Sequence, residues 1–199
     1  GESASSPWRN AANQPVGAAG KLADKVPADR NIVVGGNPTD VSGTYSAASF
    51  NPTEFLWDDL DTVNKEALRA PPYAASGTPL DAESVGQDRL DFLRGVRTNE
   101  AGGSGTNAFR KRGSVLGDIV NSGVAFSGAP VQRYADQSSF VSTYADRKKA
   151  LFVGANDGMF HAFDSATGAE LFAYIPRFLV PKLPALTSTS YKHQSYADG

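Results

Sequence analysis

The segment that decides the fold reads Ala150-Leu-Phe-Val-Gly-Ala-Asn-Asp-Gly-Met-Phe-His-Ala-Phe-Asp-Ser-Ala-Thr-Gly-Ala-Glu-Leu-Phe-Ala-Tyr-Ile175. Two turn signals divide it into three apolar stretches. The first is Asp157-Gly158, because a two-residue hairpin requires positive φ and Gly adopts it without steric cost. The second runs from Asp164 through Thr167 to Gly168: the Asp carboxylate can accept backbone N–H groups, and Gly can take the left-handed residue. We therefore predict three antiparallel strands joined by tight turns.

The middle stretch has the alternation of a β-strand. Met159, His161 and Phe163 share one face, and Phe160 and Ala162 share the other. Both sets are largely apolar, so we expect this strand to be buried on both sides.

A fourth strand is expected upstream, at residues 119–128, where apolar and β-branched residues precede Gly128-Ala-Pro130. Four short strands of this kind are typical of one β-propeller blade, and propellers have about four to eight blades. No second Asn-Asp-Gly or Asp-x-x-Thr-Gly occurs in the chain. We therefore predict a mainly β fold: an incomplete β-propeller of about one full four-stranded blade, with short helices and long loops. The remaining blades are expected beyond Gly199 or in a companion chain.

The rest of the chain divides into regions of different composition. Residues 1–29 are interpreted as an extended lead-in with Trp8 as its anchor, residues 30–112 as a strand, loops and short helices before the first blade, and residues 113–199 as that blade and the start of the next. Residues 30–36 are expected to form the strand that closes the propeller ring. Helices are predicted from Asp61 or Thr62 to residue 68, at 81–95 with Gly95 at the end, at 134–147, and as one or two turns within 176–184.

Composition excludes several classes of protein. The 199 residues include 20 Gly and 12 Pro, which argues against long helical bundles. A formal net charge of −2 with scattered Lys and Arg provides no basic surface for duplex nucleic acid. The absence of Cys excludes disulfides, thiol catalysis and Cys-ligated metals within these residues. No run of eighteen apolar residues predicts a membrane span, and the N-terminal residues do not resemble a retained signal peptide.

Candidate chemistry is sparse. His161 and His193 are the two histidines of the chain. We interpret His161 as a packed or hydrogen-bonded structural residue and assign His193 a surface or ring-closing role, since no second ligand accompanies it at a recognisable spacing. Asn156, Asp157 and Asp164 are interpreted as turn residues, because a calcium loop places oxygen ligands at alternating positions.

Other short motifs favour loops over active sites. Neither Ser114 nor Ser122 lies in a Gly-x-Ser-x-Gly motif, and the glycine-rich residues 102–105 lack a following Lys-Ser/Thr. The basic residues 110–112 are interpreted as solvated charges. The sequence therefore predicts no catalytic, cofactor-binding or metal-binding residue in this segment, and the residues singled out are structural turn residues.

Four blocks in this order resemble the PilC/PilY family of type IV pilus-tip adhesin and assembly proteins. They are Arg89-Leu-Asp-Phe-Leu-Arg-Gly95, Phe109-Arg-Lys-Arg-Gly-Ser-Val-Leu-Gly-Asp-Ile-Val-Asn-Ser122, Val153-Gly-Ala-Asn-Asp-Gly-Met-Phe-His-Ala-Phe-Asp164 and Tyr174-Ile-Pro176. The likeness begins near residue 19 and extends to residues 191–199, where Ala197 replaces the usual aromatic residue or Val.

The resemblance implies the start of a C-terminal propeller domain. Such a domain is exported through the periplasm, is exposed at a pilus tip or on the outer cell surface, and is held there by minor pilins. It supports pilus biogenesis, attachment to host or abiotic surfaces, and twitching motility. The calcium-binding loop of some relatives is absent here and is expected in blades beyond Gly199. Some relatives also carry Arg-Gly-Asp after the helix, a motif of the kind that integrins bind, whereas here Val96 follows Arg94-Gly95.

Two other functions compete with the adhesin. A dehydrogenase that depends on pyrroloquinoline quinone shares the Gly-containing hairpin followed by Asp-x-x-Thr-Gly, but its repeat usually ends in Trp, where this chain has Phe172 and Tyr174. A non-enzymatic propeller scaffold for outer-membrane assembly is the third hypothesis. We expect a non-enzymatic protein of the first kind.

Overall fold

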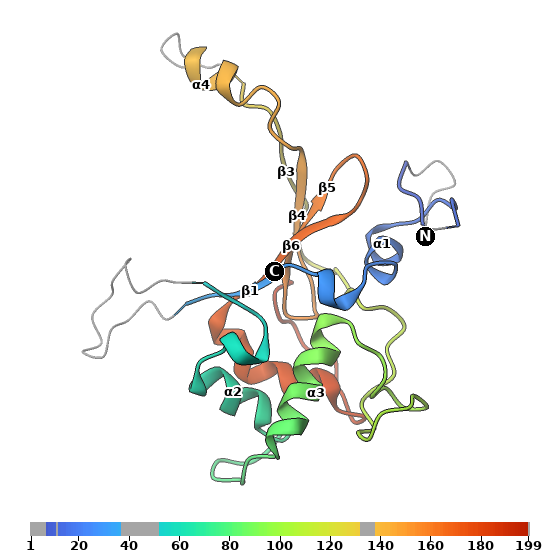
Figure 1. The fold of residues 1–199 in the computed structure, drawn as a ribbon, viewed down its shortest axis with the longest axis vertical. Coiled ribbons are helices and arrows are strands. Elements are labelled where there is room, and N and C mark those ends of the chain that lie inside the picture. Colours follow the sequence, from blue (N-terminus) through green and yellow to red (C-terminus); the bar gives the residue numbers. More distant parts are fainter. Residues whose placement is uncertain (1–6, 11, 37–51, 132–137, 199) are drawn as a thin grey trace, which may run out of the picture.

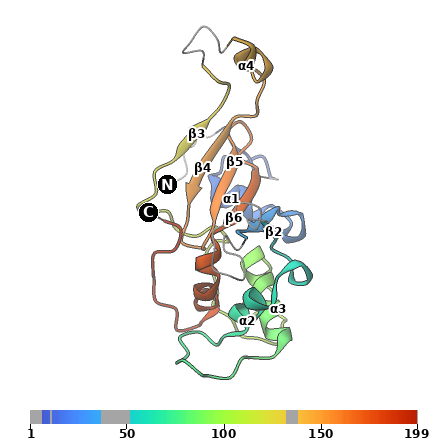
Figure 2. The ribbon, with the colours of Figure 1, turned by 90° about the vertical axis from the view of Figure 1, so that its left-hand side faces the viewer.

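The computed structural model describes residues 7–10, 12–36, 52–131 and 138–198. A central sheet lies between a narrow arm that ends in α4 and a helical part that contains α2 and α3 (Figures 1 and 2). The strands are β1 Ile32–Val34, β2 Thr53–Glu54, β3 Ala125–Ser127, β4 Ala150–Gly154, β5 Phe160–Asp164 and β6 Glu170–Ile175. The helices are α1 Ala18–Ala23, α2 Thr62–Arg69, α3 Glu83–Arg94 and α4 Ser138–Thr143, with 3₁₀ helices η1 Pro27–Asp29, η3 Trp57–Asp59 and η5 Arg177–Thr187.

The sheet has six strands in the order β2-β1-β6-β5-β4-β3. β3, β4, β5 and β6 form the expected antiparallel set of four. β1 pairs in parallel with β6, with Val33 opposite Tyr174, and β2 pairs with β1. The strand expected to close a propeller ring therefore extends the same sheet instead, and the sheet of the described residues is open.

The strand predicted upstream of β4 is shorter than expected. Of residues 119–128, only Ala125–Ser127 pairs with β4. The carboxylate of Asp198 accepts the backbone N–H groups of Val120, Asn121 and Ser122 at 2.6–3.0 Å. These N–H groups therefore bond to a side chain and not to a neighbouring strand. Strand pairing cannot include these residues, because each backbone N–H has one hydrogen to donate and Asp198 accepts it.

The first turn is one residue longer than the expected two-residue hairpin. The Ala155 N–H donates to the Met159 carbonyl at 3.0 Å, which leaves three residues in the loop. Only the last of them, Gly158, has positive φ, at 89°. This is the pattern of a type I turn followed by a left-handed residue, whereas the two-residue type I′ hairpin needs positive φ at both central positions.

The second turn is closed by its own side chain. The Asp164 carboxylate accepts the N–H groups of Ala166 and Thr167, both at 2.9 Å, and Gly168 has φ of 71°. A Cβ at residue 168 would overlap the indole of Trp8, whose Nε1–H donates to the Ser165 carbonyl at 3.1 Å. The N-terminal segment is thus anchored by Trp8 on the turn between β5 and β6. It is not extended throughout, because α1 and η1 lie within it.

We expect Gly158→Val to lower the free energy of unfolding by about 1–2 kcal/mol, because a β-branched residue at positive φ is strained. A side chain there would also meet Leu183 of η5. Urea denaturation of both chains measures the difference. Gly123→Val is the matched control, since a Cβ at Gly123 meets nothing within 4 Å and the residue lies outside the positive-φ set. Equal stability of the parent and Gly158→Val would show that residue 158 does not require the positive φ assigned to it.

The two faces of the sheet differ in burial. The core face, defined by Ile32, Val34, Val153, Phe163 and Ile175, is buried and packs on α1, the helical part and residues 115–116. The aromatic face, defined by Phe152, Phe160, Phe172 and Tyr174, is partly exposed, and Phe160 retains 39% of its accessible surface. The expectation that β5 is buried on both sides is therefore wrong for Phe160.

The helices expected at residues 61–68 and 81–95 are α2 and α3. The Asp61 carboxylate caps α2 by accepting the Asn64 N–H at 2.8 Å, and Gly95 ends α3 with φ of 117°. η5 extends over eleven residues, so the prediction of one or two turns was too short. Pro181 and Pro184 lie inside it, because a 3₁₀ helix has φ values that proline adopts. Of the helix expected at 134–147, residues 138–143 form α4, and part of the prediction lies outside the described residues.

Candidate functional site

The most distinctive site is a buried chain of charged groups behind the core face of the sheet. The Arg30 guanidinium donates two hydrogen bonds to the Glu170 carboxylate, from Nε and Nη2, each 2.8 Å long. Glu170 Oε1 lies 2.9 Å from His161 Nδ1, and His161 Nε2 lies 3.1 Å from Asp157 Oδ2. Asp157 also accepts the Gly117 N–H at 2.9 Å. We call Arg30, Glu170, His161 and Asp157 the ion chain.

A β-bulge aims Glu170 into this chain. On β5 and β6, Ala162 pairs with Phe172 but Phe163 pairs with Glu170, so Leu171 has no partner across the strand pair. If β6 alternated regularly from Ala173 through Leu171 with no bulge, Glu170 would lie on the aromatic face. Because of the bulge, Glu170 shares the core face with Phe163 and is 4% exposed.

Burial and charge act against each other on the three titratable groups. Burial lowers the pKa of His161, but the carboxylates of Asp157 and Glu170 outweigh it and raise the pKa to about 9. Burial raises the pKa of Glu170, but the hydrogen bonds of Arg30 and His161 bring it down to about 2. Burial likewise raises the pKa of Asp157, and the charge of His161 holds it below its usual value. At neutral pH the imidazolium therefore donates to both carboxylates.

This arrangement favours a structural role over acid–base chemistry. His161 is 0% exposed and both of its ring nitrogens have carboxylate partners, so neither is offered to a substrate. Arg30 Nη1 donates to the Arg94 carbonyl at 2.9 Å, and Arg94 Nη1 donates to the Phe55 carbonyl at 3.0 Å. The ion chain thus links β5 and β6 to the end of α3 and to the segment after β2.

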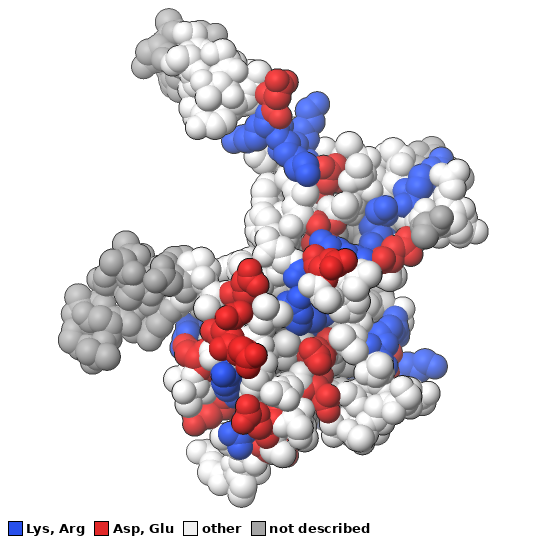
Figure 3. All heavy atoms as spheres, in the orientation of Figure 1, with Lys and Arg blue, Asp and Glu red and all other residues white. Residues whose placement is uncertain are grey.

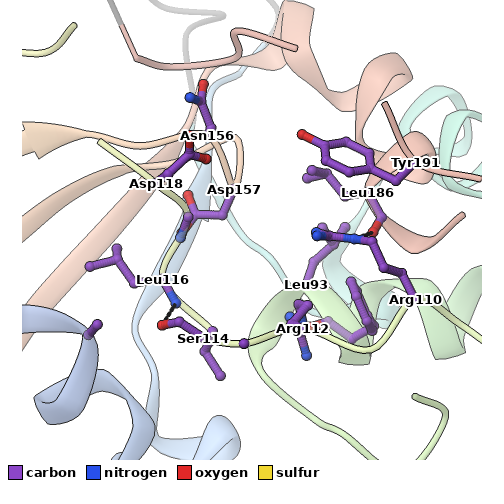
Figure 4. Close-up of a pocket in the computed structure, with 15 residues that line it drawn as sticks. Leu93, Arg110, Arg112, Ser114, Leu116, Asp118, Asn156, Asp157, Leu186 and Tyr191 are labelled. Carbon is purple, nitrogen blue, oxygen red and sulfur yellow. Dashed lines mark hydrogen bonds between the residues drawn. The ribbon is translucent and has the colours of Figure 1, made fainter. Parts of the chain in front are cut away.

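A pocket of about 410 Å³ opens beside the ion chain (Figure 4). One wall carries Asp118 and Asp157, and the facing wall carries Arg110, whose guanidinium lies 4.3 Å from the centre of the Tyr191 ring. The acidic wall is already engaged, because Asp157 pairs with His161 and Asp118 lies 2.7 Å from His193 Nε2. We therefore assign no reaction to this pocket.

A second polar cluster holds residues 193–198 against β4 and residues 120–122. The Asn156 side chain accepts the Tyr196 N–H at 3.0 Å and lies 3.3 Å from both His193 Nε2 and Asp198 Oδ2. Hydrogen bonds from Asn121, Ser122 and Val120 lower the pKa of Asp198 to about 2, although burial alone would raise it. A Cβ at Gly154 would overlap the Ala197 carbonyl, so the segment crosses directly over β4.

We expect Asp198→Ala to speed hydrogen exchange at the amides of residues 120–122, because these donors lose their shared acceptor. Hydrogen–deuterium exchange with mass spectrometry of the peptide that contains them measures this. Asp118→Ala is the control, because its carboxylate faces His193 and not these amides. Unchanged exchange in Asp198→Ala would show that the carboxylate does not hold this segment.

The predicted turn residues lie in two places. Asp157 and Gly158 lie in the first turn beside the ion chain and the pocket, and Asp164, Thr167 and Gly168 lie at the other end of β5, on Trp8. The structure does not bring the two sets together. Sequence reasoning missed Arg30 and Glu170, which are far apart in the chain and whose pairing depends on the bulge. Among the described residues, no group of three His, Asp or Glu side chains is placed to hold a metal ion.

Comparison with known proteins identifies relatives of this segment. A "Type IV pilus biogenesis factor PilY1" of Pseudomonas aeruginosa strain PAK is 37% identical over 158 residues, which is 73% of this chain and 13% of the relative. The protein of the same name from strain UCBPP-PA14 is 33% identical over 194 residues, 90% of this chain and 15% of the relative. A "Type IV pilus biogenesis factor PilY1 homolog" of Xylella fastidiosa is 40% identical over 125 residues, 58% of this chain and 10% of the relative.

The other comparisons are negative: no family model and no solved structure matches the chain. The chain spans between 10% and 15% of the length of these three relatives. The alignment that covers 90% of the chain includes residues on both sides of the β4–β6 segment. On these alignments, the chain belongs to the PilY1 family of type IV pilus biogenesis factors.

Proposed function

We propose that this chain is part of a non-enzymatic adhesin and assembly factor of the type IV pilus tip, which supports pilus biogenesis, surface attachment and twitching motility. The observation that carries the proposal is the 33% identity to a PilY1 biogenesis factor across 90% of the chain. The ion chain supports the non-enzymatic part, because its histidine is enclosed between two carboxylates. The relatives are named as pilus biogenesis factors, so the quinoprotein alternative is not favoured.

The aromatic face supports a propeller in the whole protein. Phe152 lies 6.1 Å from Phe160 and 6.3 Å from Phe172, measured between ring centres, and this apolar surface is left partly exposed. A single blade cannot bury both of its faces, so the natural occupant of this face is a neighbouring blade of the same protein or of a companion chain. Any calcium site belongs to those further blades in this proposal.

Partners and location follow from the pilus role. Minor pilins are the proposed partners that hold the protein at the tip, and a host or abiotic surface is the proposed target. The protein is exported through the periplasm and exposed outside the cell. In the part of the chain that the structure describes, no helix has the length and apolar character needed to cross a membrane.

The test is deletion of the gene in its natural source. We expect loss of surface pili and of twitching, both restored by the wild-type gene, and co-purification of minor pilins with the tagged protein. Normal outer-membrane protein levels in the deletion strain would separate this role from the scaffold hypothesis. Normal piliation and twitching in the deletion strain would overturn the proposal.

A further inference from the structure

The arm that leaves the sheet carries exposed apolar side chains towards its end. The arm consists of β3, α4 and the described segments that join them to β4, and it extends away from the rest of the molecule in both views (Figures 1 and 2). Phe140 and Tyr144 are 51% and 44% exposed, and their ring centres are 4.7 Å apart. Val131 is 79% exposed. We call these three residues the apolar tip.

Basic side chains gather where the arm joins the sheet (Figure 3). Arg147, Lys148 and Lys149 follow one another there, and we call them the basic collar. Asp146 is the one acidic residue of the sequence 138–149, so that stretch has a net charge of +2. The Arg147 guanidinium donates to the Gly128 carbonyl and the Ser127 hydroxyl, which joins the two limbs of the arm.

The two lysines of the collar are available to an outside partner. The Lys148 side chain is 66% exposed and its ammonium is 3.7 Å from Asp164, a separation and exposure at which an ion pair is weak. Lys149 is also exposed. The positive charge at this end of the molecule therefore faces solvent.

The order of these features along the arm matches the layers of a lipid bilayer surface. Aromatic side chains favour the boundary between headgroups and acyl chains, and Lys and Arg favour anionic headgroups above it. Apolar insertion and basic charge together give stable attachment where either alone gives marginal binding. A protein groove would match the apolar tip alone, whereas an anionic bilayer also accounts for the collar.

We propose that the arm binds anionic phospholipid bilayers, with the apolar tip at the acyl boundary and the basic collar among the headgroups. This inference rests on the proposed location outside the cell, and it deepens the attachment role. The ligand of the arm is then a lipid surface, and not an abiotic surface or a protein receptor.

The experiment measures co-sedimentation of the full chain with vesicles. Vesicles of phosphatidylcholine mixed with phosphatidylglycerol are compared with vesicles of phosphatidylcholine alone, at low and at high salt. We expect binding to the mixed vesicles that weakens with salt. Each Lys→Gln change at Lys148 or Lys149 should weaken it about five-fold, because a basic residue near an anionic surface contributes about 1 kcal/mol. Phe140→Ser should weaken binding without changing its dependence on salt.

Matched controls lie elsewhere on the surface. Lys182→Gln and Lys192→Gln remove the same charge from exposed positions away from the arm, and Phe178→Ser removes an aromatic side chain that is 74% exposed on η5. These variants should bind as the parent does. Failure to bind mixed vesicles, equal loss in arm and control variants, or binding to heparin but not to vesicles would each overturn the proposal. A strain that carries the arm variants should have normal piliation. Failure of the lipid-binding proposal can therefore be distinguished from failure of the proposed pilus role.

Discussion

Arg30→Met is expected to lower the free energy of unfolding by about 3–5 kcal/mol, the range for a buried ion pair that loses one partner. The side chains of Arg30 and Glu170 are 2% and 0% exposed, so water cannot replace the guanidinium. Removal of Arg30 leaves the Glu170 carboxylate with His161 and, at 4.0 Å, Lys25 as its cationic partners, and it also removes the donor to the Arg94 carbonyl. Urea denaturation followed by tryptophan fluorescence measures the loss.

Arg177→Met is the matched control. Arg177 pairs with Asp61 at 2.7 Å, but the two side chains are 21% and 48% exposed. Exposed pairs of this kind contribute about 0–1 kcal/mol, so this variant should remain close to the parent. Similar decreases in the free energy of unfolding of the two variants would mean that burial does not determine how much the ion chain contributes to stability.

Stability is expected to fall as the pH rises from about 6.5 to about 9. The unfolded chain has His161 near its ordinary pKa of 6.5, and the folded chain holds it at about 9. A raised folded pKa adds stability that is complete below pH 6.5 and is lost as the pH passes through 9. At about 1.4 kcal/mol for each pKa unit, the loss is on the order of 3 kcal/mol. The groups that face His161 are Asp157 and Glu170, with Arg30 behind Glu170.

Urea denaturation across this pH range tests the expectation. His161→Gln should be less stable than the parent near neutral pH but should lack the fall between these two pH values. His193→Gln should keep it, because that imidazole is 57% exposed and pairs with an exposed carboxylate. At the acidic end, Glu170 should make stability fall from about pH 4.5 towards pH 2, since its pKa is lowered. An unchanged alkaline slope in His161→Gln would refute the assignment of this charge.

Local signals in the sequence predict much of this fold. Asp61 and Gly95 mark helix ends through their own chemistry, and Asp164 and Gly168 lie in a turn whose hydrogen bonds are made within five residues. Each depends on neighbours a few residues away. The local sequence therefore contains all the information needed to predict such a feature.

The features that were missed depend on distant parts of the chain. The strand predicted at residues 119–128 is shortened because Asp198 takes its N–H groups, and β1 joins β6 across more than a hundred residues. The ion chain was missed because alternation counted from Ala173 assigns Glu170 to the wrong face. The bulge at Leu171 places Glu170 on the core face, and no feature of the local composition predicts that bulge.

The unpaired Leu171 also affects how this segment can diverge. Deletion of that one residue would place Glu170 directly next to Phe172, and regular alternation would then keep Glu170 on the side of Phe163 and Arg30. Among distant family members, we therefore expect an arginine at position 30 and an acid at position 170 to be inherited together even where one residue fewer separates Gly168 from Phe172.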